Sequence, residues 1–310
     1  MRQLCLWGLC VLLSCGGCGK TPKEDSAFFM GTFIKVTAHD ARAFAIVFEE
    51  FRRLDKVFNI YDRDSELSQL NRTGEMVVSD DLFQVLKMSR EFYQVTSGAF
   101  DVSVAPLALL WKQAIQDKAL PAVEDIAQAR RCVGMDYVYL DEVTRRVKLL
   151  KEGVQLDLGA LAKGYAVDRA IARLKEARIS CALVNAGGEV YCLGDNAGRP
   201  WQVAILDPRQ KGRVFGRMDL RDQAAATSGD YEQYFELNGQ RYSHIIDPRT
   251  GYPAQKGAVA ATIVSSSAAT ADALATSCLL LEPARCRDLL SRYPEVRATL
   301  VDEHGKISTL

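Results

Sequence analysis

The chain has 310 residues, of which 48% are hydrophobic, and its 39 basic and 39 acidic side chains give a formal net charge of zero. This composition is typical of a globular protein with one large domain or two coupled lobes. The balanced charge and the presence of only three histidines argue against a nucleic-acid partner, which normally requires a basic face.

The first twenty residues have the pattern of a secretion signal. Arg2 precedes an apolar run of about ten residues, which is shorter than the roughly 20 that a membrane-spanning helix needs. The run ends in Leu-Leu-Ser-Cys at 12–15, which resembles the cleavage box of a bacterial lipoprotein. We expect a lipid on Cys15, with Cys18 as the less favoured acceptor and a simple secretory signal as the alternative. The lipid would anchor the protein in the bacterial cell envelope, facing the periplasm or the exterior.

After the signal, the hydrophobic pattern predicts strands and helices in succession. Residues 21–27 are polar and are expected to form a short tether, and residues 28–38 alternate like a strand. Residues 41–58 have apolar side chains at helical spacing. Ser79 is the expected cap of a second helix, which stops at Gly98.

The rest of the chain combines strand-like hairpins with further helices. The strand-like segments are 135–150, 181–194, 200–208 and 234–247, the last with a type I′ turn at Asn238 and Gly239. A strand over 258–266 precedes a helix over 268–281. Hairpins interleaved with helices, without a regular strand–helix–strand rhythm, favour an α+β domain over a doubly wound sheet. We expect this domain to cover 28–310, with mixed and antiparallel sheets and packed helices.

Five of the nine cysteines lie beyond the signal and its junction. They are Cys132, Cys181, Cys192, Cys278 and Cys286. Their neighbours are apolar and no pair has the spacing of a zinc site, so we interpret them as small buried hydrophobic side chains. A disulfide between Cys181 and Cys192, across a predicted hairpin, is the minority alternative.

The segment 156–164, Leu-Asp-Leu-Gly-Ala-Leu-Ala-Lys-Gly, precedes an apolar periodic run and so marks the start of a helix. The first N–H groups of a helix are unpaired and attract anions. Asp157 would repel a bare phosphate but would tolerate one that carries a divalent cation. The segment therefore points to a nucleotide with a bound metal.

A later helix offers ligands for such a cation. Asp272 and Thr276 are four residues apart in the helix predicted over 268–281, so they project from one face. Carboxylate and hydroxyl oxygens suit Mg²⁺ or Ca²⁺. Taken alone, Asp272 is more simply explained as a helix cap. His244, before a sharp turn at Pro248, is most simply a hydrogen-bonded core histidine.

Eight segments together resemble the ApbE family, the FAD:protein FMN transferases, from about Phe28 to the end of the chain. In order they are MGTFIKV, IYDRDSELSQLN, SGAFDVSVAPL, LDLGALAKGYAVD, VNAGGEV, TSGDYEQYF, SHIIDPRTGYP and TADALAT. The resemblance implies an ApbE-like (T-fold-like) single domain with two lobes.

The resemblance also implies roles for individual residues. The positions that match FAD contacts are Met30, Tyr61, Ala99, Phe100, Asp101, Asp157, Lys163 and Ile246. The positions that match an Mg²⁺ site are Ala160, through its backbone carbonyl, and the side chains of Asp272 and Thr276. Ala275 is apolar where some relatives carry an acid, so one more water is expected in the metal shell.

The implied reaction is the Mg²⁺-dependent transfer of FMN from FAD to a threonine hydroxyl of an exported redox protein, with release of AMP. The metal would neutralise the pyrophosphate, and Lys163 would add a positive charge. His244 is the candidate for accepting the hydroxyl proton, because histidine titrates near neutrality, and Asp272 is the alternative. Two other classes fit the same motifs: a hydrolase that cleaves FAD to FMN and AMP, and a non-catalytic FAD-binding lipoprotein.

Overall fold

The computed structural model describes residues 21–210, 213–231, 234–237, 239–254 and 258–310. The expected signal, with Cys15 and Cys18, lies outside these ranges, as does Asn238 of the expected turn. None of the helices within the described ranges is long and apolar enough to cross a membrane.

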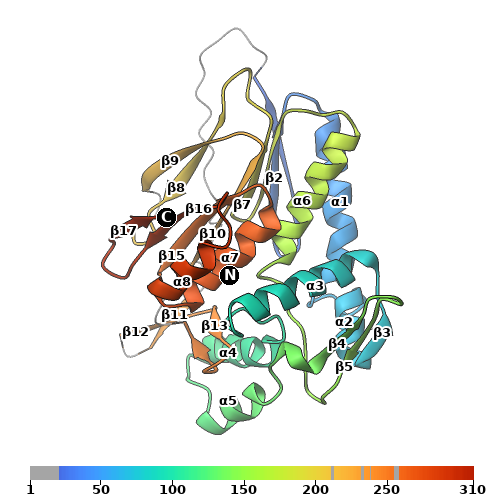
Figure 1. Ribbon diagram of the computed structural model, residues 1–310, viewed down its shortest axis with the longest axis vertical. Coiled ribbons are helices and arrows are strands. Elements are labelled where there is room, and N and C mark those ends of the chain that lie inside the picture. Colours follow the sequence, from blue (N-terminus) through green and yellow to red (C-terminus); the bar gives the residue numbers. More distant parts are fainter. Residues whose placement is uncertain (1–20, 211–212, 232–233, 238, 255–257) are drawn as a thin grey trace.

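An eight-stranded sheet runs through the molecule in the order β1-β2-β6-β7-β10-β15-β16-β17 (Figure 1). Its strands are β1 (Lys23–Phe29), β2 (Thr32–Ala38), β6 (Ala182–Ala186), β7 (Glu189–Leu193), β10 (Gln223–Gly229), β15 (Ala260–Ser265), β16 (Arg297–Val301) and β17 (Ile307–Thr309). All neighbouring pairs are antiparallel. Strands β6, β7 and β15 are buried along their whole length, so both faces of the sheet are covered.

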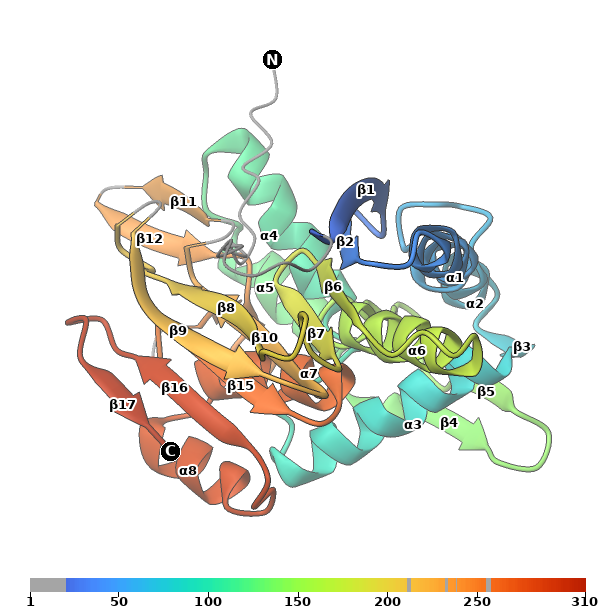
Figure 2. The same cartoon turned by 90° about the horizontal axis from the view of Figure 1, so that it is seen from above.

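Three helices cover one face of this sheet (Figure 2). They are α1 (Arg42–Phe58), α6 (Ala162–Glu176) and α7 (Ala268–Leu280). α6 packs against both of the others. α7 is buried on nearly all sides, as expected for a helix without a polar face. The opposite face carries a ribbon of β8 (Trp201–Leu206) and β9 (Val214–Leu220), in which Trp201 contributes to the core.

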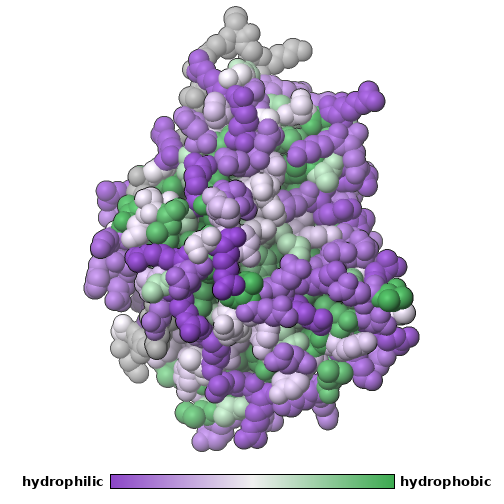
Figure 3. Space-filling view, in the orientation of Figure 1, coloured by the Kyte–Doolittle hydropathy of each residue, from purple (hydrophilic) through white to green (hydrophobic). Residues whose placement is uncertain are grey.

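A second lobe lies beside the end of this helical layer (Figure 1). It contains α2 (Glu66–Thr73), β3 (Glu75–Val77), α3 (Asp80–Val95), α4 (Ala105–Asp117), α5 (Val123–Arg130), the 3₁₀ helix η1 (Met135–Tyr137), β4 (Val138–Asp141) and β5 (Arg146–Leu149). The remaining elements are the hairpins of β11 (Tyr234–Leu237) with β12 (Gln240–Ser243) and of β13 (Ile246–Asp247) with β14 (Tyr252–Pro253), and helix α8 (Pro283–Leu290). One hydrophobic cluster extends through both lobes. The helices packed on antiparallel sheets confirm the α+β class. On the face seen in Figure 3, hydrophobic side chains form small separate groups among hydrophilic ones.

Local sequence signals located α1 and α3 correctly. Helix α1 buries the apolar side chains that recur at helical spacing, among them Phe51 and Leu54. Ser79 caps α3, because its Oγ accepts a hydrogen bond from the backbone N–H of Leu82 at 3.3 Å.

The tether expected over 21–27 was wrong for most of its length. Residues 23–27 belong to β1, which pairs with β2 through a turn at Met30 and Gly31, both with positive φ. The first four residues of β1 are polar and exposed, as is typical of an edge strand. The polar residues therefore indicate that these positions are exposed to solvent, not that a strand is absent.

Interpreting the cysteines only as isolated hydrophobic side chains was also wrong for one pair. Cys278, in α7, and Cys286, in α8, form a disulfide, because the turn after α7 directs α8 back against it. The alternative bridge is not formed, and both Cys181 and Cys192 are free thiols. The register of β6 and β7 places Cys192 opposite Leu183 rather than opposite Cys181.

Candidate functional site

Helices α6 and α7 are in close backbone contact at Gly164, in the first turn of α6. A Cβ on Gly164 would lie 2.7 Å from the carbonyl carbon of Ala268 and 2.8 Å from the Cα of Ala269, so the contact requires glycine. The close approach places Asp272 of α7 beside the start of α6. There, Oδ2 of Asp272 accepts a hydrogen bond from the backbone N–H of Gly164 at 3.1 Å. The two motifs that the sequence separates by 108 residues thus form one site.

Asp168 fixes the two helices from the other side of the contact. Its carboxylate accepts hydrogen bonds from the Oγ of Ser267 at 2.7 Å and from the backbone N–H groups of Ala268 at 2.8 Å and Ala269 at 3.0 Å. A side chain of α6 therefore caps α7. This role of Asp168 was not predicted from the sequence, although the residue ends the motif LDLGALAKGYAVD.

The carboxylate of Asp272 is 2% exposed. Burial raises its pKa, while the charge of Lys163 and the hydrogen bond from Gly164 lower it. The N–H of Gly164 donates a hydrogen bond to this carboxylate. A buried carboxylate is a suitable ligand for a cation, because its charge is then compensated.

The other two predicted metal ligands are oxygens from neighbouring elements. Thr276 lies one turn beyond Asp272, and its Oγ1 is 3.2 Å from the Oγ of Ser228 in β10. Ala160 precedes α6 by two residues. Within the described residues, no group of three or more His, Cys, Asp and Glu side chains forms a metal cluster. The chemistry of these oxygen donors fits a hard cation such as Mg²⁺.

Lys163 points back over the segment that precedes α6. Its Nζ donates a hydrogen bond to the carbonyl of Gly159 at 2.8 Å and lies 3.4 Å from Oε1 of the buried Glu189, at the start of β7. Asp157 accepts a hydrogen bond from the N–H of Gly159 at 2.9 Å. These contacts shape the turn and hold a positive charge near Asp272. The pairing of Glu189 with Lys163 was not predicted from the sequence.

Met30 and Tyr61 are linked through two side chains at the end of α1. Oδ1 of Asp55 accepts hydrogen bonds from the backbone N–H of Met30 at 3.0 Å and from the side-chain amide of Asn59 at 3.1 Å. The Oδ1 of Asn59 accepts a hydrogen bond from the backbone N–H of Tyr61 at 2.9 Å. Two predicted FAD positions that are distant in sequence are thereby joined. The ring of Tyr61 remains 65% exposed and is available for stacking.

The predicted run from Ala99 to Asp101 is next to the start of α6. The backbone N–H of Asp157 donates to the carbonyl of Val102 at 2.8 Å. Ala99 and Phe100 are buried in the core, so they have only backbone atoms to offer a ligand. Asp101 is 8% exposed, and Ser103 donates to it through both its backbone N–H at 2.8 Å and its Oγ at 2.6 Å.

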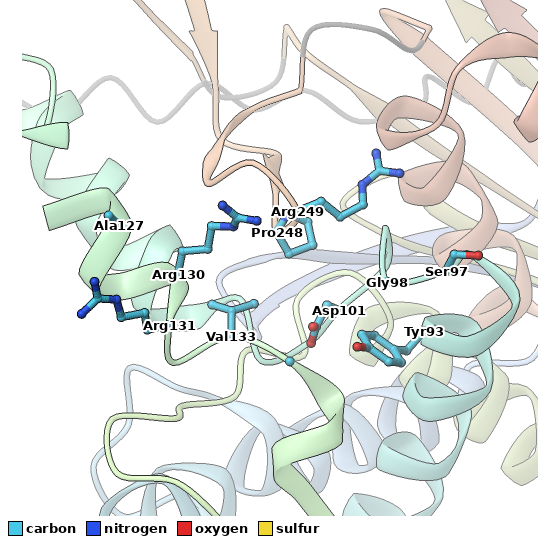
Figure 4. A pocket seen from close by; sticks show the side chains of 11 residues that line it. Tyr93, Ser97, Gly98, Asp101, Ala127, Arg130, Arg131, Val133, Pro248 and Arg249 are labelled. Atoms are coloured by element: carbon cyan, nitrogen blue, oxygen red, sulfur yellow. The ribbon is translucent and has the colours of Figure 1, made fainter. Parts of the chain in front are cut away.

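Asp101 lines a cavity of about 510 Å³ between the α3–α4 segment and the end of α5 (Figure 4). Burial raises the pKa of Asp101 to about 6, despite the hydrogen bonds from Ser103. Arg130 and Tyr93 also line the cavity, with Arg249, which is paired with Asp247 at 2.8 Å. None of the other predicted FAD positions lines this cavity.

The last two predicted residues lie around the β12–β13 connection. Ile246 is buried with Trp111 and Tyr242, so its side chain belongs to a core cluster. His244 is half-buried between β12 and β13. Its assignment as proton acceptor stays a prediction.

Comparison with known proteins identifies the family. The family model described as "ApbE family" matches residues 30–300. An FAD:protein FMN transferase from Haemophilus influenzae is 36% identical over 232 residues, covering 71% of this chain and 67% of the relative. Another from Treponema pallidum is 31% identical over 319 residues, covering 94% of this chain and 88% of the relative.

Solved structures agree with this match. The ApbE protein from Thermotoga maritima superposes with a TM-score of 0.84 at 33% identity, over 93% of this chain and 96% of that protein. The flavin transferase ApbE from Vibrio cholerae gives a TM-score of 0.80 at 27% identity, over 93% of this chain and 97% of that protein. From its sequence and its fold, the chain belongs to the ApbE family, the family of the FAD:protein FMN transferases compared here.

Proposed function

We propose that this protein transfers the FMN half of FAD to a threonine hydroxyl of an acceptor protein, with Mg²⁺ bound at Asp272, Thr276 and the carbonyl of Ala160, and releases AMP. The supporting observation is the buried carboxylate of Asp272, in α7, which is bonded to the first turn of α6, in a chain whose relatives are FAD:protein FMN transferases. The proposed FAD contacts are Met30, Tyr61, Ala99, Phe100, Asp101, Asp157, Lys163 and Ile246.

The chemistry is a displacement at phosphorus. The hydroxyl oxygen of the acceptor forms a bond to the phosphorus of the FMN half, the bond from that phosphorus to the AMP oxygen breaks, and the hydroxyl proton passes to a base. Bound Mg²⁺ would neutralise the pyrophosphate and make AMP a better leaving group. Lys163, held by Gly159 and Glu189, adds a fixed positive charge. His244 is the proposed base, with Asp272 as the alternative.

We further propose that the enzyme is attached to a membrane of the bacterial envelope by a lipid on Cys15 and modifies an exported redox protein. The disulfide between Cys278 and Cys286 supports a location outside the cytoplasm, because structural disulfides persist mainly in oxidising compartments.

The deciding experiment compares the wild type with Asp272→Asn and Asp272→Ala. The asparagine keeps the size of the side chain and an acceptor for the N–H of Gly164 but removes the charge. AMP release and flavin bound to an acceptor protein are followed as Mg²⁺ is titrated, and the thermal midpoint is measured on the same preparations. We expect both variants to lose transfer, and Asp272→Asn to keep or exceed the wild-type midpoint, because a buried charge is removed.

Each outcome identifies one function. AMP together with flavin on the acceptor indicates a transferase, AMP without it indicates a hydrolase, and bound FAD without AMP indicates a binding protein. If Asp272 serves only as a structural partner of α6, the variants will lose stability, and their Mg²⁺ dependence will match that of the wild type. That result would contradict the metal site.

A further inference from the structure

Lys112 lies against the aromatic ring of Tyr61. Its Nζ is 3.8 Å from the ring centroid, although the two residues come from α4 and from the segment after α1. A cation at this distance from a ring centroid makes a favourable cation–π contact. Among the described residues, no other cation or aromatic ring makes such a contact with Tyr61. Lys112 therefore covers one face of a ring that is otherwise largely exposed.

The backbone of Tyr61 is held independently of Lys112. The N–H of Tyr61 donates to Asn59, which is itself bonded to Asp55. These bonds fix where the side chain begins, but they leave the torsions of the side chain free. The contact with Lys112 restrains the plane of the ring from one face.

Helix α4 gives Lys112 a fixed base. The preceding residue, Trp111, is buried, and its Nε1 donates to the carbonyl of Gly251 at 2.8 Å. Trp111 also packs in the same cluster as Ile246, another proposed FAD contact. Consecutive residues of a helix point in directions about 100° apart. The side chain of Lys112 therefore points away from the side of α4 that Trp111 anchors, and it is exposed. One helix thus contacts two parts of the proposed flavin site through adjacent residues.

We propose that Lys112 is a positioning residue for the flavin. Its ammonium group covers one face of Tyr61 and holds the ring so that the opposite face receives the isoalloxazine. The inference rests on the proposed function, because it assumes that Tyr61 stacks on FAD. Lys112 itself makes no bond to the substrate and takes no part in the chemical step.

The test is a double-mutant cycle on FAD binding, read from the quenching of flavin fluorescence. Lys112→Met removes the charge but keeps an unbranched side chain, and Lys112→Arg keeps a cation that can lie over the ring. We expect Lys112→Met to weaken FAD binding about two- to five-fold, the range of an exposed cation–π contact, and to reduce the quenching of the bound flavin. Lys112→Arg should restore both. In a Tyr61→Ala background, Lys112→Met should have no further effect.

Lys56→Met is the matched control. Lys56 is an exposed lysine in the last turn of α1, so its loss changes the net charge equally without removing the cation from the ring. Equal weakening by Lys56→Met and Lys112→Met would overturn the inference in favour of general attraction to the phosphates. Equal effects of Lys112→Met with and without Tyr61 would overturn it in favour of a direct contact with FAD. Wild-type affinity in Tyr61→Ala alone would overturn the flavin role of Tyr61 in the proposed function, and the inference with it.

Discussion

Replacing Gly164 by alanine tests whether the spacing of α6 and α7 determines both stability and activity. Helix propensity alone predicts that the change stabilises the protein by about 1 kcal/mol. The structure predicts the opposite, because the new Cβ would lie 2.7 Å from the carbonyl carbon of Ala268 and 2.8 Å from the Cα of Ala269. The carbonyl oxygen of Ala268 would be closer still to this Cβ, and ordinary contacts begin at 3.4 Å, so the two backbones must separate by at least about 0.7 Å.

Separating the two backbones lowers the free energy of unfolding in two ways. Forcing a methyl group into a packed contact costs about 1–3 kcal/mol. Lengthening the 3.1 Å hydrogen bond from Gly164 to Asp272 weakens a bond to a charged group, which is worth about 1.5–3 kcal/mol. After the gain in propensity, we expect a net loss of about 2 kcal/mol or more. Because α7 also carries Thr276, we expect Mg²⁺-dependent AMP release to fall by up to about 100-fold.

The assays are urea unfolding and the Mg²⁺ titration of AMP release. Gly216→Ala in β9 is the control, since a Cβ there would lie 3.6 Å from Cδ1 of Ile205, an ordinary contact. We expect this control to change neither measurement appreciably. If Gly164→Ala were as stable and active as the control, the argument that the backbone contact positions Asp272 would be refuted.

Two further predictions concern a buried acid and the lipid anchor. Burial raises the pKa of Asp101 from 3.8 to about 6, so as the pH rises the folded state keeps the proton of this carboxyl after the unfolded chain has lost it. The contribution of this proton to stability is therefore complete below pH 3.8 and is lost as the pH rises to about 6. The difference between these two pKa values corresponds to roughly 3 kcal/mol in the free energy of unfolding. Asp101→Asn should therefore abolish that decline in the free energy of unfolding, measured by urea between pH 4 and 7, and parallel curves for variant and wild type would count against it. Cys15→Ser should release the protein from membranes or leave it unprocessed, as shown by fractionation, whereas unchanged membrane association would point to Cys18 or another anchor.

The sequence by itself was sufficient for features that depend on neighbouring residues. The 3.6-residue spacing in 41–58 and the capping side chain of Ser79 specify α1 and α3, because a helix satisfies its own backbone hydrogen bonds. The order of short motifs identified the family, and the spacing of Asp272 and Thr276 placed both on one turn of a helix. These signals are local, so no distant residue was needed to interpret them.

Contacts between distant segments were decided only by the tertiary structure. A hydrophobic pattern shows that a residue is buried, but it does not name the surface that buries it. The polar residues of β1 form a strand because they pair with the edge of β2. Cys286 is bonded to Cys278 because α8 folds back on α7. Nothing in the sequence around Gly164 indicates that Ala268 lies against this glycine, yet the contact between them brings Asp272 to the start of α6. The sequence named Asp272 as a candidate ligand, and bringing it to the start of α6 required helix packing between residues 108 positions apart in the chain.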